Sequence, residues 1–472
     1  MTVADDLAKF SRNPVFDRPP PEVIHEAKRA VLDMLGCAIG AYKATPSRIM
    51  RELADEIGGK PEATIIGSGG RTSSLNAILA NGVMVRYLDF NDTYLIPVGS
   101  QILGNHPGEL IPAVIALAER QGSSGMDVIS AIVLGYELSA RFNDSCADVN
   151  AALPTIEAKG WNADSRGAFI MPIVAGRMLG LSEEQVANAI GINGSHNMIL
   201  GILDASGEPY SMTKNLRFPR TAHSGTLSAL MAARGYTGPT RIMEGNKGFI
   251  ATVMHGEFDV PALTAPVERF MILETIFKAV AADASTHGHV NATLALVKEH
   301  DIRPEDVVKV NIKAGSRCVE HTGDAVKKYP QNKESADHSS YYLTAIAILD
   351  RKVGPNQYTP EKWTSPQALA LIDKVTFEAD PDLDQFGRAG ISEIHTRQGQ
   401  VFTKRIEYPS GDPRNRMSDA ELEDKFRDMA EPFMSSARID EIFATVYKLD
   451  QLKTIEPLTK LFAFDGGETR PT

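Results

Sequence analysis

The residues best suited to chemistry in this chain include two carboxylates and a histidine near residue 90. Asp89 and Asp92 flank Asn91, and His106 follows in a segment that contains glycine and proline. Carboxylates and imidazoles are suited to general acid–base catalysis, and catalytic groups concentrate in loops on a rigid scaffold. The alternative is structural: Asp89 or Asp92 would cap a helix, and His106 would form a loop hydrogen bond. Spacing alone leaves both interpretations open.

A second stretch is rich in positive charge. Lys214, Arg217 and Arg220 lie within seven residues of one another. Guanidinium forks and lysine point charges both bind carboxylates, so this stretch is suited to an anionic substrate. A solvated basic face is the alternative.

Two further stretches contain histidine. Lys278 precedes His287 and His289, and an H-x-H pair on a strand can bind a metal ion. No third ligand is evident in the sequence, so we predict no metal site, and His287 is either catalytic or a satisfied structural histidine. Asp337 and His338 precede an apolar segment and would act chemically or cap the following helix.

The composition is that of a soluble globular protein. The chain has 472 residues, of which 43% are hydrophobic and 23% charged, enough for two or three domains with a sizeable core. The net charge of −11 argues against nucleic-acid and membrane-surface partners. No apolar run is long enough to span a bilayer, and we expect no secretory signal. The three cysteines are far apart, so we expect no disulfide, no zinc or iron–sulfur site, and a reducing cytoplasm.

The elements that must position these residues are mainly helical in the first half of the chain. Apolar residues recur at helical spacing, and the segment that follows Ser182 has an N-cap at its start. Helices are predicted over 22–41, 110–120, 126–141, 183–192 and 224–234. Abundant glycine and alanine permit close packing between them.

The pattern changes after about residue 266. Strands are predicted at 308–312, 374–379, 391–396 and 401–408, with helices at 287–299 and 341–349. Ser418 and Glu421 then form a capping box at the start of another helix. We therefore predict a mainly α fold: a large all-helical domain from residues 1–270 and 409–472, and a smaller α+β lid from 271–408, with an antiparallel sheet.

Taken together, the motifs of this chain resemble the MmgE/PrpD family. Each motif is weak alone, but their order and spacing agree through nearly the whole chain. They are A-N-G at 80–82, L-D-F-N-D-T at 88–93, H-P at 106–107, G-Y-E at 135–137, K-G-W at 159–161, S-M-T-K at 211–214, G-Y-T-G-P at 235–239, E-G and G-F at 244–245 and 248–249, A-D-H-S at 336–339 and Y-P-S-G at 408–411.

The resemblance implies a site in the cleft between the helical domain and the lid, a homodimer, and no metal or organic cofactor. It also implies chemistry next to a carboxylate of a small polycarboxylate, because members include 2-methylcitrate and citrate dehydratases, cis-aconitate decarboxylases and an iminodisuccinate epimerase. The predicted catalytic residues are Asp89, His106, Lys214, Lys278 and His287. The predicted substrate-binding residues are Asn91, Thr93, Asn162, Arg217 and Tyr342.

Three departures from the family pattern bear on the substrate. Asn162 stands where the family often has His or Asp, and an amide neither gives nor takes a proton near neutral pH. Lys278 is followed by A-V-A-A-D, which adds Asp283. The segment between Thr93 and His106 is longer than in many relatives.

These residues predict dehydration of 2-methylcitrate or citrate. His106 or His287 would transfer protons, Asp89 would orient one of them, and Lys214 and Lys278 would hold carboxylates and the developing negative charge. Decarboxylation, epimerisation and non-catalytic binding of a polycarboxylate are the alternatives.

Overall fold

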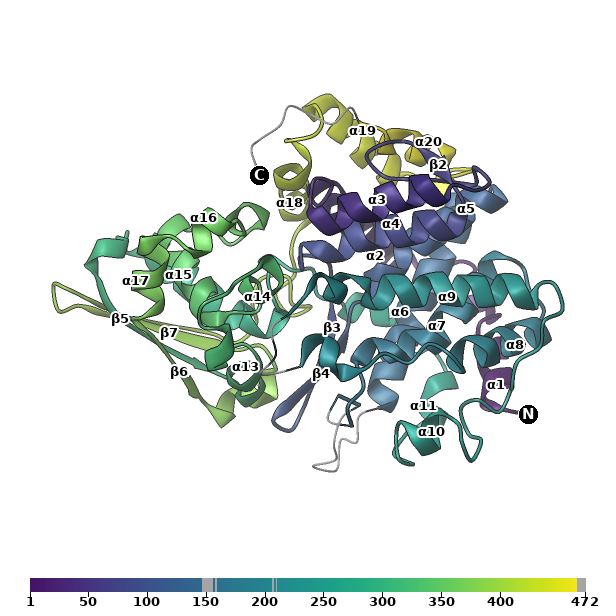
Figure 1. Cartoon of the computed structure of the whole chain (residues 1–472), viewed down its shortest axis with the longest axis horizontal. Coiled ribbons are helices and arrows are strands. Elements are labelled where there is room, and N and C mark those ends of the chain that lie inside the picture. The colour runs from purple at the N-terminus through teal and green to yellow at the C-terminus, as the bar shows by residue number, and fades with distance from the viewer. Residues whose placement is uncertain (147–155, 158, 206–207, 209, 465–472) are drawn as a thin grey trace.

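The computed structural model describes residues 1–146, 156–157, 159–205, 208 and 210–464. A large, mainly helical body lies beside a smaller part that contains a sheet (Figure 1). The predicted mainly α fold with an α+β part is therefore confirmed. No helix of the described residues has the length and apolarity that crossing a membrane requires.

The helical body is built around long helices that pack closely. Gly82 on α4 faces Pro219 on α9, where an added Cβ would lie 2.9 Å from the proline ring, so glycine permits this contact. α7 also packs against α8 and α9. The helices of this part are α1 (Val3–Phe10), α2 (Pro21–Gly40), α3 (Thr45–Ile57), α4 (Ser74–Tyr87), α5 (Ile111–Gln121), α6 (Gly125–Ser145), α7 (Gly167–Met178), α8 (Glu183–Gly194), α9 (Arg217–Ala232), α10 (Phe249–Thr252) and α11 (Val260–Thr264).

Local sequence signals set most of these ends. Ser182 caps α8 through a capping box with Gln185, as its position predicted. α9 begins at Arg217, seven residues before the predicted start, because Pro219 lies in the first turn, where a missing N–H leaves no hydrogen bond unmade.

Two short antiparallel ribbons interrupt the helices, so this part is not entirely helical. One pairs β1 (Ala63–Thr64) with β2 (Arg71–Thr72). The other pairs β3 (Tyr94–Val98) with β4 (Gln101–Asn105), and it accounts for the long segment between Thr93 and His106. In Figure 1 this second hairpin lies where the helical body meets the sheet-containing part.

The sheet-containing part has four strands in the order β6-β5-β7-β8. β5 (Val307–Ala314) pairs antiparallel with β7 (Gly390–Thr396), which pairs antiparallel with β8 (Val401–Ile406). β6 (Val375–Ala379) pairs parallel with β5, so the prediction of a purely antiparallel sheet is wrong at this edge. Buried and more exposed residues alternate along β7, and α12 packs against β7 and β8. The helices here are α12 (His287–Glu299), α13 (Ser316–His321), α14 (Lys333–Ala336), α15 (Ser340–Asp350), α16 (Pro360–Trp363) and α17 (Pro366–Ile372).

The C-terminal helices return to the helical body. α18 (Asp419–Ala430) packs on α2, where an added Cβ at Gly36 would lie 2.7 Å from the Met429 side chain. α19 (Ser436–Tyr447) and α20 (Glu456–Thr459) follow, and Ser418 and Glu421 form the predicted capping box. The division at residues 270 and 409 stays a prediction.

Candidate functional site

Asp89 is the centre of a buried charged cluster. It follows α4 with φ 50°, a left-handed conformation that a short polar side chain tolerates better than most. Its carboxylate pairs with Arg86 at 3.1 Å, with Lys214 at 2.8 Å and with Lys278. Burial alone would raise the pKa of Asp89, but these cations outweigh it and hold the pKa well below its usual value.

Three distant segments bring these cations together. Lys214 lies in the short 3-10 turn Met212–Leu216 that precedes α9, and Lys278 lies in the segment before α12. The Lys278 ammonium also donates to the Asp89 carbonyl oxygen at 3.0 Å. Burial lowers the pKa of Lys278 although Asp89 opposes the change. Three of the predicted catalytic residues therefore share one ion-pair cluster.

The cluster continues into the segment between α14 and α15. Lys214 Nζ lies 3.2 Å from Asp337 Oδ1 and 3.2 Å from His338 Nδ1, and Asp337 also pairs with Lys333 at 2.7 Å. Ser339, not Asp337 or His338, supplies the N-cap of α15, so the capping interpretation of this pair is wrong. Asp337 and His338 were outside the predicted site, although the A-D-H-S motif had marked them.

His106 lies near the cluster without a hydrogen bond to it among the described contacts. It follows β4, and its Nδ1 lies 2.7 Å from the carbonyl oxygen of Asp92, which leaves Nε2 without a backbone partner. Burial, with the charges of Arg86, Lys278 and Arg217, holds the pKa of His106 well below its usual value. The imidazole is therefore neutral at physiological pH.

Asp92 has a structural role. Its carboxylate accepts hydrogen bonds from the Gly108 N–H at 3.0 Å and from the Tyr136 hydroxyl at 2.5 Å. Burial and the charge of Asp33 raise the pKa of Asp92 to about 7. Of the structural alternatives, the loop hydrogen bond of His106 is present, whereas Asp92 holds the loop through Gly108 and Tyr136 without being a helix N-cap.

Asn91 and Thr93 make hydrogen bonds in the same region. The Asn91 amide donates to Glu109 at 3.2 Å, and Glu109 lies 3.2 Å from the Arg86 guanidinium. Burial raises the pKa of Glu109 to about 8, despite Arg86. Thr93 donates its hydroxyl to the Asn105 carbonyl at 2.9 Å and pairs by its backbone with Ile276, two residues from Lys278.

Asn162 and Arg217 form a neighbouring polar group through Asp164. Asn162 accepts from the Asp164 N–H at 3.0 Å, and Arg217 lies 2.7 Å from the Asp164 carboxylate. Arg217 influences the pKa of both Arg86 and Glu109, which places this group beside the cluster.

Two predicted residues lie in other surroundings. The Tyr342 hydroxyl donates to the Gln357 carbonyl, and the side chain is buried in α15 with no described contact to the cluster. His287 begins α12, where its Nε2 lies 3.3 Å from the Ala282 carbonyl. His289 lies two positions further along the same helix, and residues at this spacing do not face each other. The H-x-H pair is therefore on a helix and not on a strand.

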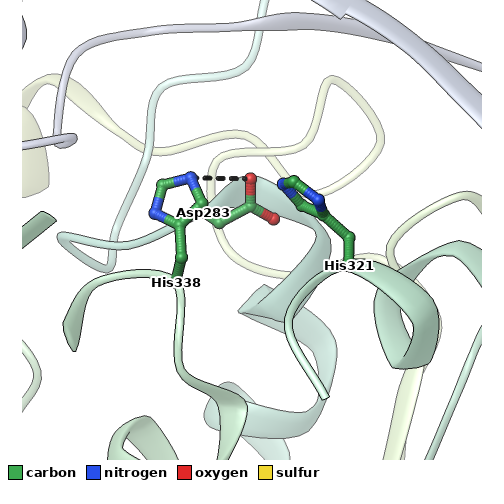
Figure 2. A group of neighbouring side chains, drawn as sticks. All are labelled: Asp283, His321 and His338. Atoms are coloured by element: carbon green, nitrogen blue, oxygen red, sulfur yellow. Dashed lines mark ion pairs between the residues drawn. The ribbon is translucent and has the colours of Figure 1, made fainter. Parts of the chain in front are cut away.

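A group of three that spacing did not reveal lies next to the cluster. Asp283, His321 and His338 each place a ligand-type atom within 4.8 Å of the others. Figure 2 shows the Asp283 carboxylate between the two imidazoles, with His338 Nε2 at 3.5 Å from it. The added acid after Lys278, Asp283, therefore lies next to the cluster.

The cavity that opens between the β3–β4 hairpin and the sheet-containing part has a volume of about 240 Å³. It includes Tyr94 and Ile276, each within two residues of Thr93 or Lys278, but none of the predicted site residues lines it. The Asp89 cluster is the candidate site, because buried cations are the groups that bind the carboxylates of an anionic substrate.

Comparison with known proteins shows which family the chain belongs to. The MmgE/PrpD N-terminal domain model matches residues 5–261, and the C-terminal domain model matches residues 280–449. Cis-aconitate decarboxylase of Aspergillus terreus is 24% identical, over 97% of this chain and 95% of that protein. Cis-aconitate decarboxylase of Homo sapiens is 26% identical, over 93% and 90%. The 2-methylcitrate dehydratase of Salmonella typhimurium is 23% identical, over 83% and 82%.

Proposed function

Because the chain belongs to the MmgE/PrpD family, we propose that it is a carbon–oxygen lyase that removes water from 2-methylcitrate or citrate. The observation that carries the proposal is the convergence of Lys214, Lys278 and Arg86 on the single carboxylate of Asp89. Three enclosed cations on one carboxylate suit a ligand that carries several carboxylates of its own.

In this proposal substrate carboxylates take over part of the pairing that Asp89 provides. Lys214 and Lys278 would then face the carboxylate next to the reacting carbon. As the α proton leaves, negative charge moves onto that carboxylate, and preorganised cations stabilise it without reorganisation. Asp89 keeps the lysines in place before and after the reaction.

His106 is the base in this scheme. Its Nδ1 lies 2.7 Å from the Asp92 carbonyl, which fixes the Nδ1–H tautomer and leaves the Nε2 lone pair free. Burial and the cations around it lower the pKa of the imidazole and so favour the neutral form that a base requires. His287, the other histidine predicted to transfer protons, has no described hydrogen bond or ion pair to the cluster.

Decarboxylation of cis-aconitate is the second candidate, because the decarboxylase relatives align over more of this chain than the dehydratases do. The same cations would bind the tricarboxylate, but carbon dioxide would leave instead of water. Epimerisation and simple binding are further outcomes of the same test.

The test is product analysis by NMR after incubation with 2-methylcitrate, citrate, cis-aconitate and iminodisuccinate. The proposal expects unsaturated acids from the two hydroxy acids, with and without a chelator, because the scheme uses only side chains. Lys278→Met should lose turnover, while Lys352→Met, whose ion pair with Asp428 is exposed, should not. Carbon dioxide from cis-aconitate, inversion of iminodisuccinate, thermal stabilisation without turnover, or inactivation by the chelator would each contradict it.

We also propose that the protein acts as a cytoplasmic homodimer with residues 271–408 as a lid. Light scattering after size-exclusion chromatography would give twice the 51.2 kDa chain mass. A monomeric mass for active enzyme would contradict the dimer.

A further inference from the structure

The structure contains a second imidazole in contact with the cluster, in the segment between α14 and α15. His338 is nearly fully buried, and its Nδ1 lies 2.5 Å from Asp337 Oδ1. Its Nε2 lies 3.5 Å from Asp283 and 3.8 Å from Asp89. The Tyr210 ring packs edge-on against it at 5.0 Å and limits its orientation.

We propose that His338 is the acid that protonates the departing hydroxyl, oriented by Asp337 and stabilised as imidazolium by Asp283. This role rests on the proposed function. The α C–H bond breaks, its proton passes to His106 Nε2, and its electron pair forms the new C=C bond. The C–O electron pair leaves with the oxygen, which takes the His338 proton and departs as water.

The charges around His106 and His338 differ in the way that a base and an acid require. Burial lowers the pKa of His106 most, and the cations Arg86, Lys278 and Arg217 lower it further against the opposing charge of Asp89. His338 has three carboxylates within 4 Å, those of Asp337, Asp283 and Asp89. Paired titratable groups in opposite surroundings divide the roles of base and acid.

Lys214 and His321 also face His338, and they influence its protonation before substrate binds. Burial and Lys214 lower the pKa of His338, against the opposing effect of Asp337 and Asp283. His321 lies across Asp283, with its ring centre 5.8 Å from that of His338 (Figure 2). A substrate carboxylate that pairs with Lys214 cancels the nearest positive charge, so polycarboxylate binding favours the protonated acid.

Asp283, His321 and His338 have the spacing of metal ligands, but the surrounding charge favours an acid. Lys214 lies 3.2 Å from the His338 ring, and Arg317 and Lys327 both act on His321. These cations repel a divalent ion and attract a carboxylate.

The test is His338→Gln, with His289→Gln as a matched control. His289 is equally buried on α12 and contacts Phe377 and Cys318, outside the cluster. Citrate and 2-methylcitrate are incubated in D₂O, and both dehydration and deuterium incorporation at the α carbon are followed by NMR. His338→Gln should lose about 10²–10⁴-fold in dehydration yet retain deuterium incorporation, since the base is intact. His289→Gln should match the wild type in both.

The outcomes separate this inference from the proposed function. A wild type that dehydrates neither acid overturns the proposed function. An active wild type with His338→Gln within threefold of it, or with exchange and dehydration lost together in a folded variant, overturns the acid role alone. One bound transition metal per wild-type chain, lost with His338→Gln, would also overturn it.

Asp283→Asn provides a second test if His338→Gln does not fold. The Asp283 side chain is 23% exposed, so the amide is tolerated more easily. Removing a carboxylate this close should move the basic limb of the kcat–pH profile down by about one pH unit, because imidazolium loses a stabilising charge. An unchanged profile contradicts the role.

Discussion

Asp89→Asn removes the charge on which the cluster is centred. The Asp89 carboxylate is 2% exposed and pairs with Lys214 at 2.8 Å, with Arg86 at 3.1 Å and with Lys278. At an effective dielectric constant of about 20, each pair contributes on the order of 5 kcal/mol before desolvation is subtracted. Removing one partner from a buried pair typically costs about 3–5 kcal/mol, because the remaining charge stays buried and unpaired. We expect a loss of stability of this size.

The assay is urea unfolding followed by tryptophan fluorescence and circular dichroism. Because a chain of 472 residues need not unfold in one step, the comparison uses the midpoint of the transition that both signals report. Glu52→Gln is the matched control, since its ion pair with Arg48 is more than half exposed and contributes less than about 1 kcal/mol. Asp89→Asn and Glu52→Gln midpoints that agree within error would refute the reasoning.

The pH dependence of this effect has a definite sign. The folded-state pKa of Asp89 is depressed, so its contribution is complete above the unfolded value of about 4 and is lost as pH falls through the folded value. The difference between wild type and variant should therefore be equal at pH 6 and pH 8. Lys278→Met combined with Asp89→Asn should recover part of the lost stability, because the double variant buries one cation fewer.

Three other variants test separate parts of the site. His106→Gln should lower kcat about 10²–10⁴-fold with an unchanged circular dichroism spectrum, and near-normal turnover of folded protein would exclude the base role. Glu109→Gln should remove a pH dependence of stability. Because the pKa of Glu109 is raised to about 8, wild-type stability should fall by about 2 kcal/mol between pH 6 and pH 8 as the buried carboxyl ionises. Urea unfolding at both pH values measures this change, and an equal change in the variant would contradict it. Tyr342→Phe should change kcat and KM less than about twofold and cost about 1 kcal/mol of stability, because its hydroxyl serves the Gln357 carbonyl; a tenfold loss of activity would return Tyr342 to the site.

The sequence predicted the elements well where local signals decide them. α12 was predicted with its observed ends, and the alternation of Val310 and Ile312 with lysine and asparagine gave β5. Val308 begins the predicted strand 308–312 but is 52% exposed, because the pairing of β5 with β7 shifts between Val307 and Lys309. Such a shift depends on the partner strand and has no signal in the strand itself.

The sequence predicted part of the site, because local motifs are visible in it and the approach of distant residues is not. Asp89, Lys214 and Lys278 were named from motifs, and the structure joins them in ion pairs. His338 was found in a motif but not assigned to the site, because its chemistry comes from Asp283 and Asp337 together, and the approach of residues 55 positions apart is fixed only by the tertiary fold. The A-D-H-S motif and the unusual acid after Lys278 were the available signals.

The measurement that tests the central claim most directly is the fate of cis-aconitate and its 2-methyl homologue in H₂¹⁸O. A hydro-lyase catalyses both directions, so the account predicts hydroxy acids that retain every carbon and carry one ¹⁸O in the new hydroxyl group, seen by mass spectrometry. Loss of Lys278 should abolish this label. A product one carbon shorter, with carbon dioxide released and no ¹⁸O incorporated, would contradict dehydration and assign the cluster to decarboxylation.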